Sequence, residues 1–489
     1  RSVAIGTFSL MTQNFTTTTN TYNTAVGHHA GANITVGQYN TLIGGLAGDA
    51  LVDGGRNTAV GYAALSTEDE NGQNTAIGYR ALTTLNAGAE GYNVAVGNDA
   101  GLSVTTGVRN TIMGSFAGDA LTDADYNVAL GYAALTGDTQ GSQSTAVGYE
   151  ALLTQNFSTA TNTFNTAVGY RAGTAVTTGV NNTLIGATAG DAFTDADANT
   201  AIGAYALTAD TMGSQSTAVG HGSLAHQNFT TATAANNTAI GYIAGNLITT
   251  GINNTLIGGL AGDANTTGAN NVAVGSDALG ANTTAAANTA VGHRAGYVNT
   301  TGYSNTFLGS FAGDLVTTGF DNVLIGHNCA SQGTSLVTGD YNCIVGVSTS
   351  VDSTDANKAN SFGQALSATG GYTTLGNGAD DIRAAHGNTS WATVSDERVK
   401  KDITDATAGL SFINDLTPRT FKYRTKGDIP KEFHGYEEGS TESYKNDKTN
   451  HGFIAQEVKK VIEAHPEIKD GFKLWDVREK TGQQEVAEA

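Results

Sequence analysis

The chain has 489 residues and a formal net charge of −20, and its length suits roughly two to four ordinary domains. Of its 24 Lys and Arg residues, 17 lie from Arg383 onward, so the part before them carries most of the negative charge. An acidic surface repels a phosphate backbone, and no apolar run approaches the ~20 residues that span a bilayer. We therefore expect no nucleic-acid partner and no membrane insertion.

The start of the chain and its cysteines indicate where the protein is made. The sequence begins at Arg1 without Met or a signal-peptide pattern, so we expect a further N-terminal part. Cys329 and Cys343 are too few for a disulfide framework. They predict small buried side chains in a protein assembled in a reducing cytoplasm.

A short sequence repeat runs through most of the chain. It reads NTAVG at 23–27, NTLIG at 40–44 and NTAIG at 74–78, and its final glycine usually recurs after 17 residues. We count twenty-two copies up to Gly376. Longer loops such as TQNFSTATNTFN stretch some spacings to 19–21 residues. Fixed self-similarity of this kind predicts a stacked repeat architecture.

The repeat composition favours short strands over helices. Gly, Thr, Asn and Val dominate, and Gly and Asn mark turns, so each copy predicts one coil of a parallel β-solenoid. We expect the aliphatic residue before the repeat glycine, such as Val26 or Ile43, to fill the coil interior, and the preceding Ala or Leu to face a neighbouring layer. The Asn four residues before the glycine predicts a side-chain ladder in which Asn also takes the αL conformation.

The predicted core of one coil is thin, with one or two aliphatic side chains and some alanines. Burial at ~25 cal/mol per Å² must outweigh ordering costs of ~1–2 kcal/mol per residue. We therefore expect three chains to share one core, as a homotrimer. The string SVAIG at 2–6 resembles the head repeats of trimeric autotransporter adhesins. That resemblance implies a left-handed β-roll trimer, but the spacing here is longer and the membrane anchor of those adhesins is absent.

The composition changes after the repeats, and three motifs follow in order. They are SDERVKKDI at 395–403, LTPRTF at 416–421 and GFIAQEV at 452–458. The longer string LSFINDLTPRTFKY at 410–423, which contains the second motif, predicts a short helix, a proline-marked break and a strand. The third motif runs into an amphipathic helix. Together they resemble the endosialidase-type intramolecular chaperone, a small α+β domain at the end of phage tailspikes and tail fibres. In that family the domain trimerises, folds the preceding β-structure and releases itself by serine-dependent autoproteolysis.

The resemblance implies three parts and a set of site residues. The parts are a solenoid shaft at 1–376, a linker with the cleavage site at 377–394 and a chaperone domain at 395–489. Family members continue with a leucine-rich helix, which we expect to be missing here because the sequence stops at GQQEVAEA.

By the same resemblance, Ser395 is the nucleophile, Lys400 is its base, and Val394–Ser395 is the scissile bond. A lysine acts as a base when burial or nearby positive charge lowers its pKa. Arg398 supplies such a charge, and Asp396 either opposes it or orients the loop. The predicted enzyme is thus a serine peptidase that acts once on its own chain, and we expect no turnover activity of the shaft.

Other candidate sites have weaker signals. The loops GDALTDADYN and GDAFTDADAN place carboxylates two residues apart, as calcium loops do, but they lack the bidentate Glu. The histidines have no metal-ligand spacing, so we expect no metal and no cofactor. Tyrosines such as Tyr132 and Tyr149 recur after the repeat glycine. We favour rings that face inward and cap the coil over exposed rings that stack on sugars.

These patterns imply a homotrimeric phage tail fibre or spike in the virion, made in the host cytoplasm. Its shaft would attach to a host cell-surface glycan or receptor, and its N-terminal part would contact other tail proteins. Two alternatives stay open. One is a glycan-depolymerising tailspike, which needs paired carboxylates roughly 5–10 Å apart. The other is a bacterial trimeric adhesin.

Overall fold

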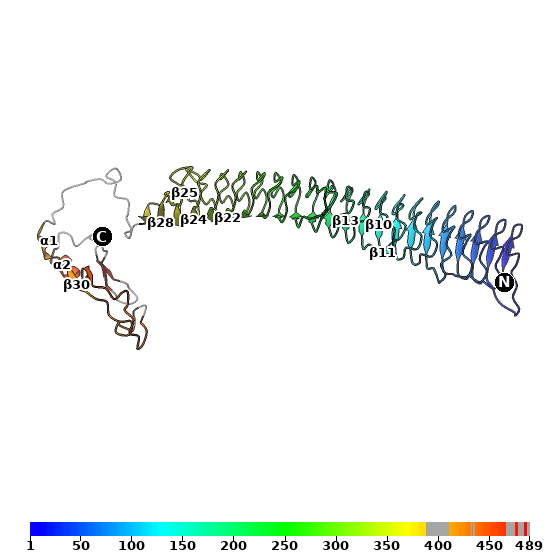
Figure 1. Ribbon diagram of the computed structural model, residues 1–489, viewed down its shortest axis with the longest axis horizontal. Helices are drawn as coiled ribbons and strands as arrows, with labels where there is room; N and C mark the ends of the chain where they lie inside the picture. The colour runs from blue at the N-terminus through cyan, green and yellow to red at the C-terminus, as the bar shows by residue number, and fades with distance from the viewer. Residues whose placement is uncertain (388–409, 432, 434–435, 466–474, 478–483, 487–489) are drawn as a thin grey trace. The chain divides into compact units, whose positions relative to one another are not determined.

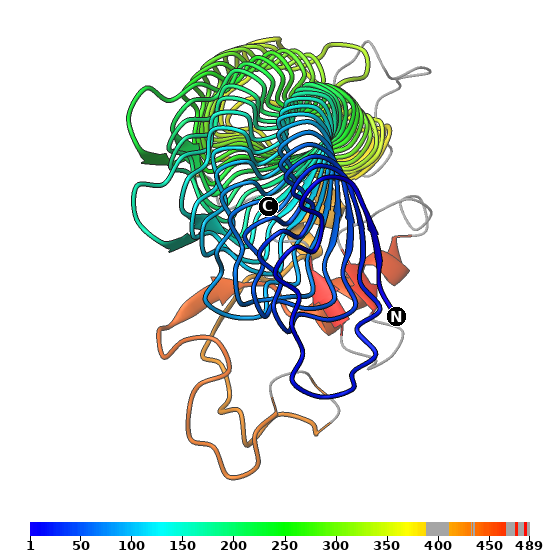
Figure 2. The same ribbon diagram turned by 90° about the vertical axis from the view of Figure 1, so that its right-hand side faces the viewer.

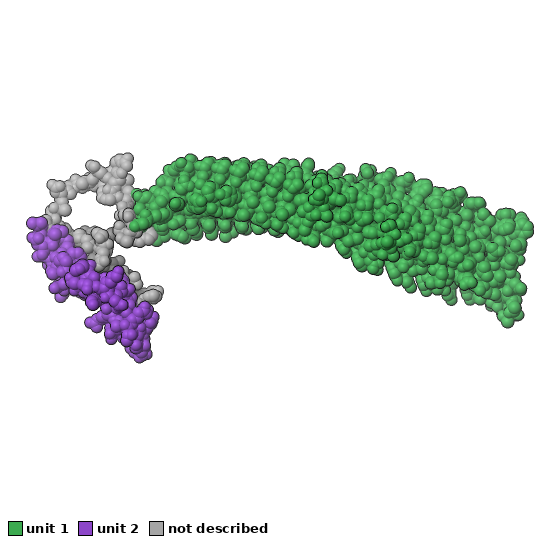
Figure 3. Space-filling view, viewed as in Figure 1, with its two compact units in different colours: residues 1–391 green, residues 392–489 purple. Residues whose placement is uncertain are grey.

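The computed structural model describes residues 1–387, 410–431, 433, 436–465, 475–477 and 484–486. The chain forms two compact units, Arg1–Trp391 and Ala392–Ala489, which are coloured separately in Figure 3. Each unit is considered by itself below.

The first unit is a parallel β-solenoid in which each coil contributes one short strand to a common sheet (Figure 1). The sheet has 23 described strands. Within this sheet, β29 pairs antiparallel with β28, and the other described pairings are parallel. Its strands are β1 (Val3–Ile5), β2 (Thr24–Val26), β3 (Thr41–Ile43), β4 (Thr58–Val60), β5 (Thr75–Ile77), β6 (Val94–Val96), β7 (Thr111–Met113), β8 (Val128–Leu130), β10 (Thr145–Val147), β12 (Thr166–Val168), β13 (Thr183–Ile185), β14 (Thr200–Ile202), β16 (Thr217–Val219), β18 (Thr238–Ile240), β19 (Thr255–Ile257), β20 (Val272–Val274), β21 (Thr289–Val291), β22 (Thr306–Leu308), β23 (Val323–Ile325), β24 (Cys343–Val345), β26 (Asn360–Gln364), β28 (Tyr372–Asn377) and β29 (Asp380–Ala385). The predicted solenoid of about 17-residue coils is confirmed.

Longer loops add small accessory sheets beside the stack. They are the parallel pairs β9 (Gly141–Ser142) with β11 (Thr161–Asn162), β15 (Gly213–Ser214) with β17 (Thr233–Ala234), and β25 (Ser350–Val351) with β27 (Ser367–Ala368). Figure 2 looks along the stack, where two of these loops project on the same side of the shaft. The strands of the main sheet pair in register, for example Ala25 with Leu42.

The prediction of which strand face is buried is wrong. Ala25 and Leu42, at the strand centre, are fully buried, whereas Ile43 before the repeat glycine is 41% exposed. The physical reason lies in the turns, whose large side chains, such as Ile34 and Leu51, already fill the coil interior. The centre of each strand fills the rest of the interior, with a small residue such as Ala25 or a larger one such as Leu42, and the residue before the repeat glycine points outward.

The asparagine ladder exists, but its geometry differs in part from the expectation. Asn40 N–H donates to Asn23 Oδ1 at 2.9 Å, and Asn57 N–H donates to Asn40 Oδ1 at the same distance. Each side-chain amide also donates to a carbonyl in a turn, as Asn40 does to Gly54 at 2.9 Å. The αL conformation belongs to the residue before the asparagine, for example Tyr39 at φ 62°. The expectation that Asn itself takes αL is therefore wrong, because Asn is held in the core by both ends of its amide.

The repeat glycine is required for two reasons, seen at Gly44. Its φ is +139°, a conformation that side-chain-bearing residues rarely adopt. A Cβ atom there would also lie 2.3 Å from the carbonyl oxygen of Gly61 in the next coil. Close stacking of the coils thus depends on glycine at this position.

The second unit contains α1 (Leu410–Asp415), β30 (Arg419–Phe421), β31 (Asn450–Gly452), α2 (Ala455–Ala464), β32 (Trp475–Val477) and β33 (Gln484–Val486). The strands form two antiparallel pairs, β30 with β31 and β32 with β33. The helix, break and strand predicted from LSFINDLTPRTFKY, and the helix predicted after Gly452, are confirmed. Within the described parts of the chain, neither helix is long and apolar enough to cross a bilayer.

Candidate functional site

The predicted catalytic residues lie outside the described residues. Val394, Ser395, Asp396, Arg398 and Lys400 all fall in the segment 388–409. Their roles, and the Val394–Ser395 cleavage site, therefore stay predictions. The described part of the same unit begins at α1 and contains the other two motifs.

The two later motifs pack together through a small apolar core. Phe412 on α1 contacts Val458 and Ile462 on α2, and all three are at most 7% exposed. Leu416 and Phe453, from the second and third motifs, pack against this core. The short helix, the proline turn and the amphipathic helix are thus one folded element.

A charged pair joins β30 to α2 beside this core. Arg419 donates from Nε and one terminal nitrogen to the two carboxylate oxygens of Glu457, at 2.9 and 3.0 Å. The bond to Arg419 holds the pKa of Glu457 below its usual value. A cavity of about 240 Å³ lies next to the pair, with Leu416, Phe453 and Val461 in its lining. The motif residues therefore build both the core and the concave surface of this unit.

The outer face of the main sheet is uncharged from β2 to β26. Position by position, it presents the first residue of each strand, mostly Thr, and the apolar residue before the repeat glycine. We call the second row, from Val26 to Phe362, the apolar stripe. Several of its members are 36–45% exposed: Ile43, Ile77, Met113, Ile185, Ile240, Ile257, Leu308 and Phe362. No Asp, Glu, Lys or Arg interrupts it, although the chain carries a net charge of −20.

The tyrosines after the repeat glycine are exposed and stack on one another. Tyr132 and Tyr149 have ring centroids 5.3 Å apart, and Tyr149 and Tyr170 have centroids 5.5 Å apart, with planes within 13°. Because neighbouring rings cover each other's faces, the row presents mainly ring edges and hydroxyls to solvent. The expectation that these rings face inward and cap the coil is therefore wrong, because they are 44–54% exposed. They pack on one another at the surface of the stack instead.

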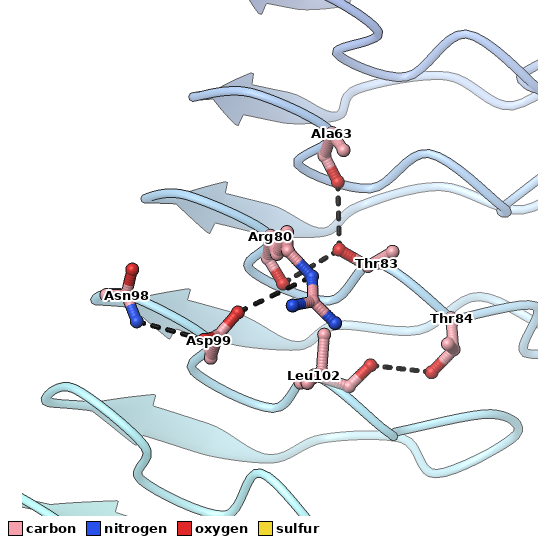
Figure 4. Close-up of polar contacts among 7 residues, drawn as sticks. All are labelled: Ala63, Arg80, Thr83, Thr84, Asn98, Asp99 and Leu102. Carbon is pink, nitrogen blue, oxygen red and sulfur yellow. Dashed lines mark hydrogen bonds and ion pairs between the residues drawn. The ribbon is translucent and has the colours of Figure 1, made fainter.

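Polar side chains connect successive coils on another face of the shaft (Figure 4). Thr83 donates to the carbonyl of Ala63 in the preceding coil at 3.0 Å. Within its own coil, Asn98 donates to Asp99 Oδ2 at 3.0 Å. Arg80 Nε lies 3.6 Å from Asp99 Oδ1, so these charges serve the stacking of coils.

The carboxylates of the candidate calcium loops have structural partners. Asp125 accepts a hydrogen bond from Val108 N–H at 2.8 Å, and Asp197 accepts one from Val180 N–H at the same distance. Among the residues that the structure describes, no three His, Cys, Asp or Glu side chains gather as a metal site. These acidic residues fasten one coil to the next.

Sequence reasoning missed two buried polar clusters in the QNF loops. Gln155 Nε2 donates to Asp138 Oδ2 at 2.6 Å and to Ser144 Oγ at 2.8 Å, and its Oε1 accepts from Asn165 at 2.9 Å. Ser144 stands where most coils have the ladder asparagine, so Gln155 fills the gap that the shorter side chain leaves. Gln227 repeats the arrangement 72 residues later. The signal was in the sequence, because Ser144 and Ser216 each occur in the coil just before a QNF loop.

Comparison with known proteins identifies the C-terminal part. No curated protein and no solved structure matches the chain. Residues 395–465 match the family model described as the chaperone of endosialidase, and this range includes the packed motifs on α1, β30, β31 and α2. The chain therefore carries a domain of the chaperone of endosialidase family at residues 395–465, preceded in sequence by a β-solenoid shaft.

Proposed function

We propose that the protein is a phage tail fibre or spike that attaches the virion to its host, and that its C-terminal domain folds and trimerises the shaft. The observation that carries this proposal is the chaperone family match directly after a long β-solenoid. Because the coils of the shaft are similar to one another, two chains could align in many registers of nearly equal free energy. A domain that fixes the number of chains and the register in which they begin to associate would select one of these alignments.

The apolar stripe supports a homotrimer. Exposed apolar surface of this length is rare on a protein that works alone, and it marks surfaces that contact other chains. The stripe and the threonine row beside it carry no charge that would oppose a second copy of the same face. Three chains, each turning its stripe toward a common axis, would bury it.

The proposed self-cleavage follows from the family motif. Lys400, in its neutral form, takes the proton of the Ser395 hydroxyl while the oxygen attacks the carbonyl carbon of Val394. The carbon–nitrogen bond breaks, Lys400 returns the proton to the released amine, and an ester links the two residues. Water then hydrolyses the ester, which leaves a carboxylate on Val394 and a free amine on Ser395. Arg398 favours the neutral lysine by its charge, and Asp396 orients the segment.

The intact mass of the full chain tests this proposal. We expect the wild type to yield a fragment that begins at Ser395, and Ser395→Ala and Lys400→Ala to stay whole. Ser440→Ala and Lys448→Ala are matched controls in the same domain and should be cleaved like the wild type. If the wild-type chain trimerises and is not cleaved, the chaperone domain stays attached to the shaft, and the catalytic roles of Ser395 and Lys400 are wrong.

A further inference from the structure

A groove lies on the outer surface of the shaft near its N-terminal end. It spans successive coils and has a volume of about 270 Å³, close to the lower end of the ~300–1,000 Å³ range of small-molecule sites. The polar and aromatic side chains in its lining are Gln38, Tyr39, Asp53, Arg56, Glu70 and Glu90.

The groove lies where the repeat changes locally. In three successive coils the residue six before the repeat glycine is itself glycine: Gly55, Gly72 and Gly91. The same position holds Gln38 in the coil before and Val108 in the coil after. Of these three glycines, Gly55 lines the groove, which lies between two rows of larger residues. One row contains Tyr39 and Arg56, five before the glycine, and the other contains Asp53 and Glu70, eight before it.

Several lining side chains are held in place by residues outside the groove. Tyr39 is 51% exposed and stacks on Tyr22, with centroids 5.6 Å apart and planes at 16°. Asp53 Oδ1 accepts a hydrogen bond from the Thr35 hydroxyl at 2.9 Å. Because these contacts fix the side chains before any ligand arrives, a ligand would lose less free energy in ordering them.

Glu90, at the end of the groove that lies further along the chain, is also held by a residue outside the groove. Gln73 Nε2 donates to Glu90 Oε2 at 2.9 Å and to the Tyr92 hydroxyl at 3.1 Å. Glu90 thus keeps one carboxylate oxygen in a defined place at the edge of the groove.

The chemistry of this lining suits a sugar. Carboxylates, a guanidinium and an amide offer acceptors and donors for adjacent hydroxyl groups. Tyr22 covers one face of the Tyr39 ring, and the exposed half of the ring offers apolar contact to carbon-bound hydrogens. Three carboxylates against one arginine give the groove a net negative charge, which disfavours an anionic ligand. We propose that this groove binds a saccharide without acidic groups, presented as part of a longer glycan. This inference rests on the proposed function, since it assigns the host-glycan contact to one place on the shaft.

The test is binding of the full chain to an array of defined oligosaccharides that includes neutral, amine-bearing, carboxylated and sulfated members. Tyr39→Ala and Arg56→Ala remove groove residues, and Tyr126→Ala and Arg109→Ala are matched controls at the same position of other coils. All four residues have φ of 59–62°, so alanine meets the same backbone geometry in each case. Binding of the same labelled proteins to a panel of bacterial strains is measured in parallel.

We expect neutral or amine-bearing sugars to bind, and each groove variant to weaken binding about tenfold, the equivalent of one lost aromatic or charged contact. The controls should bind like the wild type. Binding that both groove variants retain, binding confined to acidic sugars, or no binding to any sugar would overturn the inference. If the groove variants still bind cells, the proposed attachment function is retained, and the proposal that the groove makes the contact is wrong. If sugars bind in the groove but the protein binds no bacterial strain, saccharide binding by the groove is retained and the proposed attachment function is wrong.

Discussion

Single buried side chains decide how well each coil stacks on the next. Asp138 is fully buried beside Gln155, and it also accepts hydrogen bonds from the N–H groups of Gly141 and Phe157 at 3.0 and 3.2 Å. Burial raises the pKa of Asp138 above its usual value, more than these hydrogen bonds lower it. The free energy of burying the ionised carboxylate therefore outweighs the gain from the bonds that it accepts.

This raised pKa predicts a pH-dependent stability. A carboxyl group with a higher pKa in the folded state binds its proton more tightly when folded. Its stabilising contribution is complete below the unfolded value near 3.8 and is lost as pH rises through the folded pKa. We expect the urea midpoint of the wild type to fall relative to that of Asp138→Asn between about pH 3 and 7. Asp123→Asn, at an exposed position, controls for removal of a charge. A wild-type advantage over Asp138→Asn that grows with pH would contradict the assignment.

At the scale of one strand, the sequence determines which residues share a face but not which face is inside. The alternation of side chains along Thr-Ala-Val correctly predicts that the first and third residues lie on the same face of the sheet. The alternation is the same whichever face points inward, so it cannot distinguish Ala25 from Val26 as the interior residue. In a 17-residue coil, however, Leu51 and Leu85 from the turns take the interior volume, which short-range patterning does not reveal.

The candidate sites were predictable to different degrees. The tail motifs identify their helix, turn and strand because each motif residue has a local role, such as Pro418 after α1. The bond between Arg419 and Glu457 joins residues 38 positions apart, and spacing alone does not predict such a pair. The groove was missed for a related reason: its lining residues, such as Gln38 and Glu90, belong to different coils and come together only when the coils are stacked in register.

The packing of α1 on α2 gives a prediction at this scale. Phe412→Ala should open a cavity in the small core and destabilise the two helices by about 3–5 kcal/mol. Hydrogen exchange of the α2 amides measures the loss directly. Ile413→Ala is the control, since Ile413 lies on the same helix and is 60% exposed. Equal loss of protection in the two variants would mean that α1 is held by a different face.

At the scale of the whole shaft, small contributions from each coil add along its length. Full burial of one aliphatic side chain contributes ~1.5–3 kcal/mol, and a half-exposed one about half of that. Over the apolar stripe the sum is on the order of tens of kcal/mol, which exceeds the ~4–15 kcal/mol cost of bringing chains together. The absence of charge along the stripe matters equally, because one buried unpaired charge in each coil would cancel the gain.

A trimer built on the apolar stripe should therefore respond to charge on that face and tolerate it elsewhere. Leu308→Lys with Ile257→Lys places two lysines per chain in the stripe, at residues 44% and 36% exposed. Leu315→Lys with Leu247→Lys places two at positions outside the stripe that are 42% and 44% exposed. We expect the first pair to lower the temperature at which the trimer dissociates, because like charges then meet across the axis in low dielectric. Light-scattering mass during a temperature ramp measures this transition, and the second pair should keep the wild-type value. If both pairs lower it equally, the stripe is not the contact between chains; if neither does and the mass is that of one chain throughout, the shaft is monomeric.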